Sequence, residues 1–294
     1  MNSLAPMTSV GPPGPAAFPR QAETDDQLLR LWLHGRPGTT TRAYSADVGQ
    51  FIAFVGKRLQ SITVGDLQEF ADTLAELSDA SRARKLSAVK SLLSYGHRIG
   101  YLPFNVGAPV RLPRIKDTIA ERILPEEMVL KMLALEPKPR NQAVLRLLYG
   151  AGLRVSELCG LRWRDMQERE DAGQVTVYGK GGKTRHVLLS SGTWDALTAI
   201  RGEAGDDAPV FVSRTGGPLS RTQAFRIVRA AAKRAGVDKD VSPHWLRHAH
   251  ASHALDRGAA VHLVQATLGH SSVATTGRYL HARPTDSSSR YLAI

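Results

Sequence analysis

The chain has 294 residues, 42% of them hydrophobic, and a formal net charge of +12. This length is enough for two domains with buried cores. The charge favours a polyanionic partner over a basic surface that is only solvated. Among such partners, nucleic acid is favoured over an anionic membrane. The sequence has no run of about 18 apolar residues that could span a membrane, and no secretion signal is evident. The single cysteine, Cys159, excludes an intrachain disulfide, so a reducing cytoplasm is the expected location.

The N-terminal part is expected to be helical after an unstructured start. Residues 1–22 are rich in proline, glycine and alanine, which predicts a disordered tail. From 23 to 105 the apolar residues recur at helical spacing. Helix starts are expected at Thr39–Thr41, at Thr63 and after Ser78. The pattern predicts a small helical bundle.

Basic residues mark two features of this part of the chain. One side of the third helix is interpreted as a phosphate-tracking face rather than an ordinary solvated one, and it carries Arg82, Arg84, Lys85 and Lys90. Prolines interrupt residues 106–118 and block helix continuation there, so this segment is predicted to be an extended linker. Its basic residues are suited to crossing a nucleic-acid backbone: Arg111, Arg114 and Lys116.

A second domain is predicted from 119 to 294. Pro125 and the two glutamates after it favour a helix start, and a buried helix over 141–149 is expected to end at the glycines that follow. Residues 174–178 and 184–189 have the pattern of two strands around a glycine-rich turn, hence a β-hairpin. Everything after about 219 is helical again. The expected fold class is mainly α with a small β-hairpin or sheet.

The segment from Ser242 to Arg247 predicts an anion site at the start of a helix. Serine as N-cap and Pro243 at the first helical position favour a helix start. His244 and Arg247 are then i, i+3 neighbours on one face. The free N–H groups and partial positive charge of the helix N-terminus suit an anion.

Two further polar residues are expected near helix ends. A helical stripe ends at Gly269, and His270 follows in the turn. Ser271 or Ser272 is expected to cap a short helix that carries Tyr279. Glycine and serine thus hold both polar residues where side chains from different segments meet.

Arg154 and Lys180 lie upstream of this region. Apolar neighbours flank Arg154, so it is expected close to the core with an anionic partner. Lys180 lies in the turn of the predicted hairpin, where its ammonium group can swing onto a ligand.

Two other kinds of site are weighed against this interpretation. The run from Gly179 to Thr184 resembles a P-loop, but Val177 stands where that loop needs glycine, and a strand rather than a helix is predicted after Thr184. The histidines between 244 and 253 include an i, i+4 pair, but no His-Glu-x-x-His arrangement, so zinc is disfavoured. His248, His250 and His253 are interpreted as surface or satisfied core residues.

Taken in chain order, these motifs resemble those of tyrosine recombinases of the Xer and phage-integrase type. The segment AGLRVSEL resembles the family's first arginine box, GKGGKTR its lysine hairpin, HWLRH its His-x-x-Arg box, and LGH with the later tyrosine its last histidine and nucleophile. The resemblance covers nearly the whole chain. It implies an N-terminal SAM-like core-binding domain, a basic linker and a mixed α+β catalytic domain.

The resemblance also implies a reaction on double-stranded DNA. Tyr279 would attack a scissile phosphate, giving a 3′-phosphotyrosyl bond and a free 5′-hydroxyl. Arg154 and Arg247 would clamp the non-bridging oxygens, and His270 would add a hydrogen bond there. The implied roles of the remaining residues are general acid for Lys180, proton transfer at the tyrosine for His244, and orientation of the site for Glu157.

The implied assembly is a homo- or hetero-tetramer on two DNA sites, with no metal, ATP or other cofactor and no membrane. Lys183 and Arg185, beside the lysine hairpin, are further candidates for DNA binding. Beyond Tyr279 the usual Xer ending is not recognised in residues 280–294. Two alternatives are a type IB topoisomerase, which relaxes DNA without strand exchange, and a DNA-binding factor of the same fold without catalysis.

Overall fold

The computed structural model describes residues 21–170, 172–179, 182–270 and 272–282. The chain divides into two compact units, Met1–Lys116 and Asp117–Ile294, each with its own buried core. This division falls inside the segment 106–118 that was interpreted as a linker. The tail predicted over 1–22 lies outside the described residues up to residue 20.

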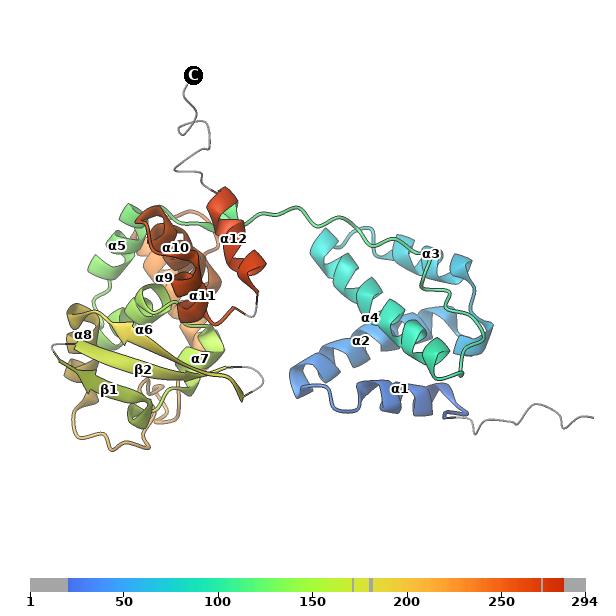
Figure 1. The fold of residues 1–294 in the computed structure, drawn as a ribbon, viewed down its shortest axis with the longest axis horizontal. Helices are drawn as coiled ribbons and strands as arrows, with labels where there is room; N and C mark the ends of the chain where they lie inside the picture. Colours follow the sequence, from blue (N-terminus) through green and yellow to red (C-terminus); the bar gives the residue numbers. More distant parts are fainter. Residues whose placement is uncertain (1–20, 171, 180–181, 271, 283–294) are drawn as a thin grey trace, which may run out of the picture. The chain divides into compact units, whose positions relative to one another are not determined.

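The first unit is helical (Figure 1), as the sequence predicted. Its elements within the described residues are α1 (Asp25–Leu33), α2 (Gly38–Val55), η1 (Leu59–Ser61), α3 (Val64–Thr73) and α4 (Asp79–Arg98). The core lies where α1, α2, α3 and α4 pack together, with Phe51 and Phe70 edge to face at a centroid distance of 5.2 Å. Burying such aromatic pairs is a main source of stability in a unit of this size.

Local capping decides where these helices begin. Thr63 accepts a hydrogen bond from the backbone of Asp66 and donates its own backbone N–H to the Asp66 carboxylate, which confirms the predicted start of α3. Ser78 caps α4 as expected. The start predicted at Thr39–Thr41 is wrong, because α2 begins at Gly38 behind Pro37 and the threonines lie in its first turn. There the Thr41 hydroxyl donates to the Pro37 carbonyl instead of capping.

The second unit combines a small sheet with helices. The sheet is antiparallel in the order β1 (Met166–Arg169), β2 (Ala172–Tyr178) and β3 (Thr184–Leu189). The predicted hairpin is confirmed by β2 and β3, and β3 begins where a P-loop would require a helix. The sequence missed β1, which has one buried residue and therefore no alternation to detect.

Helices cover this sheet and build the rest of the second unit (Figure 1). Those before the sheet are η2 (Ala120–Arg122), α5 (Glu126–Ala134), α6 (Pro139–Gly150), α7 (Val155–Gly160) and η3 (Trp163–Asp165). Those after it are α8 (Ser191–Arg201), α9 (Arg221–Arg234), α10 (Pro243–Asp256), α11 (Val261–Leu268) and α12 (Val273–Ala282). The helix α8 packs on β2 and α6, while α10 contacts α5, α6, α9, α11 and α12. The side chains of α10 therefore reach most of the unit. No helix in the described part of the chain is both long and apolar enough to cross a bilayer.

Candidate active site

Arg154 lies at the turn between α6 and α7. It occupies the N-cap position of α7, and its backbone N–H donates to Glu157 Oε2 at 2.8 Å. Its guanidinium donates to Glu157 Oε1, also at 2.8 Å, and to the Gly269 carbonyl at 3.3 Å. The side chain keeps 35% of its surface exposed. The anionic partner expected for Arg154 is therefore Glu157, and one side of the guanidinium stays open to a ligand.

Gly152 makes this turn possible. Its φ is +59°, in the left-handed region that favours glycine. A Cβ at this position would stand 2.6 Å from Leu268 Cδ2 and 3.0 Å from His250 Cδ2. The turn that carries Arg154 thus lies directly against α10 and α11, with no room for a side chain.

We expect Gly152→Ala to lower the free energy of unfolding by more than its backbone conformation alone explains. The left-handed conformation costs an alanine about 1–2 kcal/mol, and overpacking adds about 1–3 kcal/mol. Gly236→Ala is the matched control, because Gly236 has a φ of +81° with nothing within 4 Å of the added Cβ. Denaturant unfolding measures both variants, and equal losses would contradict the tight packing at Gly152.

Arg247 approaches the same turn from α10. Its side chain is buried, with the residue only 4% exposed, and its guanidinium donates to the Gly152 carbonyl and, at 2.6 Å, to the Leu268 carbonyl. Desolvation, and then the nearby charge of Arg154, lower the pKa of Arg247 to about 10. The group therefore stays charged at neutral pH. Both bonds go to neutral carbonyls, so neither supplies the counter-charge that a buried cation needs.

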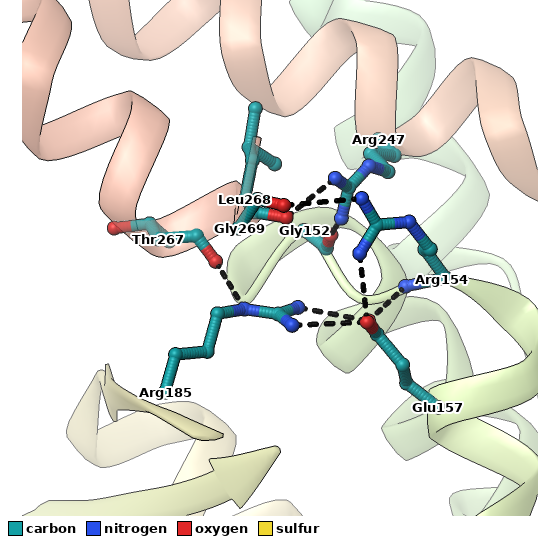
Figure 2. Close-up of polar contacts among 8 residues, drawn as sticks. All are labelled: Gly152, Arg154, Glu157, Arg185, Arg247, Thr267, Leu268 and Gly269. Atoms are coloured by element: carbon teal, nitrogen blue, oxygen red, sulfur yellow. Dashed lines mark hydrogen bonds and ion pairs between the residues drawn. The ribbon is translucent and has the colours of Figure 1, made fainter. Parts of the chain in front are cut away.

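Arg185 is the third guanidinium of this cluster (Figure 2). It reaches across from β3 and donates two hydrogen bonds to the Glu157 carboxylate, at 2.9 and 2.8 Å, and a third to the Thr267 carbonyl at 2.7 Å. Its side chain is only 12% exposed. The expectation that Arg185 faces DNA conflicts with this geometry, because its fork is taken up by Glu157.

A single carboxylate thus lies among three guanidinium groups and is hydrogen-bonded to two of them, those of Arg154 and Arg185. Burial on its own would raise the pKa of Glu157, but the hydrogen bonds from Arg185 and Arg154 lower it to about 2. Figure 2 shows Arg154 and Arg247 directed at the same Leu268–Gly269 turn, with Arg185 on the other side of Glu157. One negative charge against three positive ones leaves an excess at Arg154 and Arg247, and a bound anion would balance that excess.

Tyr279 lies on α12 beside this cluster. It is 4% exposed and packs with Ile119, Ile123, Val264 and Leu268 in a small core of its own. The ring of His270 stacks on it, with a centroid distance of 6.4 Å and an interplanar angle of 7°. Burial raises the pKa of Tyr279, and the charges of Arg247 and Arg278 oppose that rise. The hydroxyl is therefore protonated at neutral pH and needs a base to react.

His270 is oriented from its other side. Its Nδ1 is 2.9 Å from the Thr276 hydroxyl, and the Gln265 amide donates to its backbone carbonyl at 3.1 Å. Desolvation, followed by the charges of Arg247 and Arg154, lowers the pKa of His270 to about 4. A neutral imidazole has one N–H, and this group is free to donate to an anion when Nδ1 accepts from the Thr276 hydroxyl.

His248, interpreted from the sequence as a surface or satisfied core residue, is half-buried and hydrogen-bonded. Its partner is Tyr279, whose hydroxyl lies 2.7 Å from Nδ1. His244, to which proton transfer at the tyrosine was assigned, has an exposed edge and contacts His248 at a ring-centroid distance of 6.4 Å. Among the described residues no hydrogen bond joins His244 to Tyr279. The i, i+4 spacing of the two histidines was the signal that could have placed both on one face.

The other two histidines of α10 are satisfied within the protein, as interpreted. His250 Nδ1 lies 2.7 Å from the Tyr149 carbonyl, and His253 Nδ1 lies 3.0 Å from the Tyr149 hydroxyl. Both belong to the packing of α10 on α6. The start of α10 at Pro243 agrees with the sequence, although Ser242 makes no side-chain capping bond.

The remaining candidates of the second unit lie at the hairpin. Lys180 falls outside the described residues. Its neighbour Lys183 is exposed, and the Lys183 carbonyl accepts from the Gly179 N–H at 2.7 Å across the turn.

In the first unit the basic face of α4 is partly occupied. The Asp47 carboxylate is buried and pairs with Arg84 and Lys85, and Lys85 is nearly buried as a result. Lys90 donates to the Val110 carbonyl. A buried carboxylate needs such partners, so Lys85 is not free to track phosphates as expected. Arg84 is still half exposed, and Arg82 pairs with Asp79 at 3.7 Å.

The basic residues of the predicted linker are all exposed: Arg111, Arg114 and Lys116.

Two family models match the chain. The model described as the phage integrase family matches residues 122–286. The model described as the phage integrase N-terminal SAM-like domain matches residues 31–99. Together they cover most of both units.

Individual proteins are similar over most of the chain. Tyrosine recombinase XerC of Xylella fastidiosa (strain M23) is 35% identical over 258 residues, covering 84% of the chain and 87% of that protein. Two solved structures share the fold. The XerH site-specific recombinase bound to its difH substrate has a TM-score of 0.70 and 22% identity, covering 92% of the chain and 84% of that one. A lambda integrase tetramer bound to a Holliday junction has a TM-score of 0.69 and 20% identity, covering 86% and 79%.

Proposed function

The chain belongs to the phage integrase family of tyrosine recombinases, which are DNA strand-transferring enzymes, and on this premise we propose which residues carry out its reaction. Tyr279 is the nucleophile that attacks a DNA phosphate. The product is a 3′-phosphotyrosyl bond and a free 5′-hydroxyl. A 5′-hydroxyl from a partner strand reverses the step and completes site-specific recombination.

The excess positive charge at Arg154 and Arg247 supports this proposal most directly. A phosphate held by both guanidiniums places its non-bridging oxygens where negative charge develops in the transition state. Arg247 is desolvated and rigidly bonded, so its charge acts with little screening by water. Arg154 contributes the more exposed half of the clamp.

The supporting roles follow from the same geometry. His270, neutral and stacked on Tyr279, donates its free N–H to the phosphate. Glu157 orients Arg154 through two hydrogen bonds, and Arg185 holds Glu157 in place. Lys180 at the hairpin tip is the general acid for the departing 5′-oxygen, a role that rests on its motif. His244 is assigned to the phosphate rather than to the tyrosine, because the charges of Arg247 and Arg154 act on it and no hydrogen bond joins it to Tyr279 among the described residues.

Tyr279 is almost buried on α12, so the restraints on this helix bear on how DNA reaches the hydroxyl. The helix is tied to the start of the unit by Arg278, which donates to both Asp117 carboxylate oxygens at 2.9 and 2.7 Å. Both side chains are about half exposed. An ion pair this open to water and salt contributes little to stability, so it is a weak restraint on α12.

We propose that the protein acts as a tetramer on two DNA sites. Its proposed location is the cytoplasm. The lambda integrase tetramer on a Holliday junction supports the first, since the chain shares its fold. The net charge of +12 supports duplex DNA as the partner. The basic residues proposed to contact its backbone are the exposed Arg84, Arg111, Arg114, Lys116 and Lys183, together with the partly buried Arg82.

The test begins with a duplex that the protein selects from a random-sequence library. A nick near the cleavage position of that duplex traps the covalent intermediate, because the short 5′-hydroxyl strand diffuses away. We expect a protein–DNA adduct that forms equally well in EDTA and whose phosphopeptide maps to Tyr279. An adduct on another residue would contradict the proposal. Resolution of plasmids carrying two sites, rather than supercoil relaxation alone, would separate recombination from topoisomerase activity.

A further inference from the structure

His248 is placed to receive the proton of the proposed nucleophile. Its Nδ1 lies 2.7 Å from the Tyr279 hydroxyl oxygen, and the two rings lie 5.7 Å apart at a tilt of 44°. A distance of 2.7 Å is ordinary for a good O–H···N hydrogen bond. For Nδ1 to accept, the ring proton stands on Nε2 and the imidazole is neutral.

The surroundings of His248 keep its imidazole neutral. Desolvation, followed by the positive field of its neighbours, lowers the pKa of His248 to about 4. The charged or titratable groups that face it are His244 and Arg247 on its own helix, Arg122 on η2, Arg278 and Tyr279 on α12, and Asp117 before η2. Three of these are arginines and one is a carboxylate, so the field opposes a proton on the free ring.

We propose that His248, rather than His244, is the general base that takes the Tyr279 proton during strand cleavage. The Tyr279 O–H bond breaks as its proton passes to Nδ1, and the phenolate oxygen forms the bond to phosphorus. The P–O5′ bond breaks, and the departing oxygen takes a proton from the general acid. Ligation runs the same steps in reverse, so His248⁺ returns the proton to the tyrosine. An incoming phosphate adds negative charge near His248 and favours its protonated form at that moment.

This inference rests on the proposed role of Tyr279 and sharpens it. His244 shares a face of α10 with His248, but the charges that act on it are those of the two guanidiniums of the clamp. Desolvation and the charges of Arg247 and Arg154 lower the pKa of His244. His244 is therefore assigned a contact with the phosphate, and His248 is assigned the proton of the nucleophile.

Three variants separate a chemical role from a structural one. His248→Ala removes both the hydrogen bond and the base. His248→Asn keeps an acceptor near the position of Nδ1 but cannot hold the proton. The matched control is His253→Asn, because His253 is a buried histidine of the same helix that bonds a different tyrosine hydroxyl, that of Tyr149. Thermal unfolding and binding of the selected duplex check each variant before its cleavage is measured.

Single-turnover adduct formation on the nicked duplex is the readout. We expect both His248 variants to be slower by about 10²–10⁴-fold, and His253→Asn to match the wild type. The His248→Asn rate should climb from pH 7 to pH 9, as hydroxide replaces the base, while the wild-type rate stays flat. Free imidazole should restore part of the His248→Ala rate.

A second substrate distinguishes the base from the acid. A sulfur atom in place of the bridging 5′-oxygen makes a leaving group that needs no proton, so it should rescue a Lys180→Ala variant but neither His248 variant. Rescue of His248→Ala by sulfur, or a His248→Asn rate within about threefold of wild type, would overturn the assignment, since a lost base must cost far more. If Tyr279→Phe itself formed the adduct, the proposed function would fail instead, so the two failures are distinguishable.

Discussion

Tyr279→Phe is expected to bind the selected duplex as tightly as the wild type and to form no covalent adduct. Phenylalanine keeps the ring that packs with Ile123 and Leu268 and stacks on His270, so the small core around α12 survives. Only the hydroxyl is lost, together with its hydrogen bond to His248. A hydrogen bond of this kind contributes about 0.5–1.5 kcal/mol to folding, which is too little to unfold the unit.

Gel mobility of the nicked duplex under denaturing conditions measures the adduct, and native gels measure binding. Tyr149→Phe is the matched control. Its hydroxyl is also bonded to a histidine of α10, at 3.0 Å, and to Glu126 at 3.2 Å, but it lies outside the arginine cluster. That variant should form the adduct at the wild-type rate. A persistent adduct in Tyr279→Phe would show that another side chain is the nucleophile.

Glu157→Gln is expected to cause the largest loss of stability among single changes at the site. The carboxylate neutralises Arg185 and Arg154 at once and is itself only 6% exposed. Removing one partner of such a buried network costs about 3–5 kcal/mol, because the remaining charges stay buried without compensation. Adduct formation should fall as well, since Arg154 loses the group that orients it.

The pH dependence of this loss has a definite sign. The folded pKa of Glu157 is about 2, below its ordinary value of 4.5, so folding favours the ionised form. Its stabilisation is complete above pH 4.5 and disappears as the pH falls towards 2. The gap in free energy of unfolding between wild type and Glu157→Gln should therefore be wide at pH 7 and narrower at pH 3.

Denaturant unfolding followed by tryptophan fluorescence measures both effects. The control is Asp207→Asn, which breaks the pair with Arg164 at 2.6 Å between side chains that are 81% and 60% exposed. Surface pairs of this kind contribute about 0–1 kcal/mol. The double variant Glu157→Gln, Arg185→Met should recover part of the loss, because it removes an uncompensated charge. A Glu157→Gln variant no less stable than Asp207→Asn would contradict the charge balance of the cluster.

Short-range patterns in the sequence predicted most of the helices and strands. The starts of α3 and α4 depend on Thr63 and Ser78, which bond backbone groups three residues away. The stop of α11 at Gly269 depends on one left-handed residue, with φ +63°. Alternation over a few residues predicts β2 and β3. Each of these features is decided by neighbours in the chain, so the sequence contains the information directly.

Patterns among neighbouring residues could not predict which side chains meet across the site. Only the family motifs indicated some of these residues. Arg185 looks in the sequence like a surface residue beside a basic hairpin, and only the packing of β3 against α11 turns it towards Glu157. In the sequence Lys85 belongs to an exposed basic face, but in the structure it pairs with the buried carboxylate of Asp47 on another helix. In both cases a charge is redirected by a partner far away in sequence.

His248 shows the same limit at the centre of the chemistry. The motif spacing indicated which residue types gather around a phosphate, because a helix places i, i+3 and i+4 neighbours on one face whatever surrounds it. Which of those neighbours contacts the tyrosine depends on how α12 packs against α10, and that packing is made by side chains spread over residues 119 to 279. Local sequence thus specified the helices and the charges they carry, while the packing of α12 on α10 decided which histidine contacts the tyrosine.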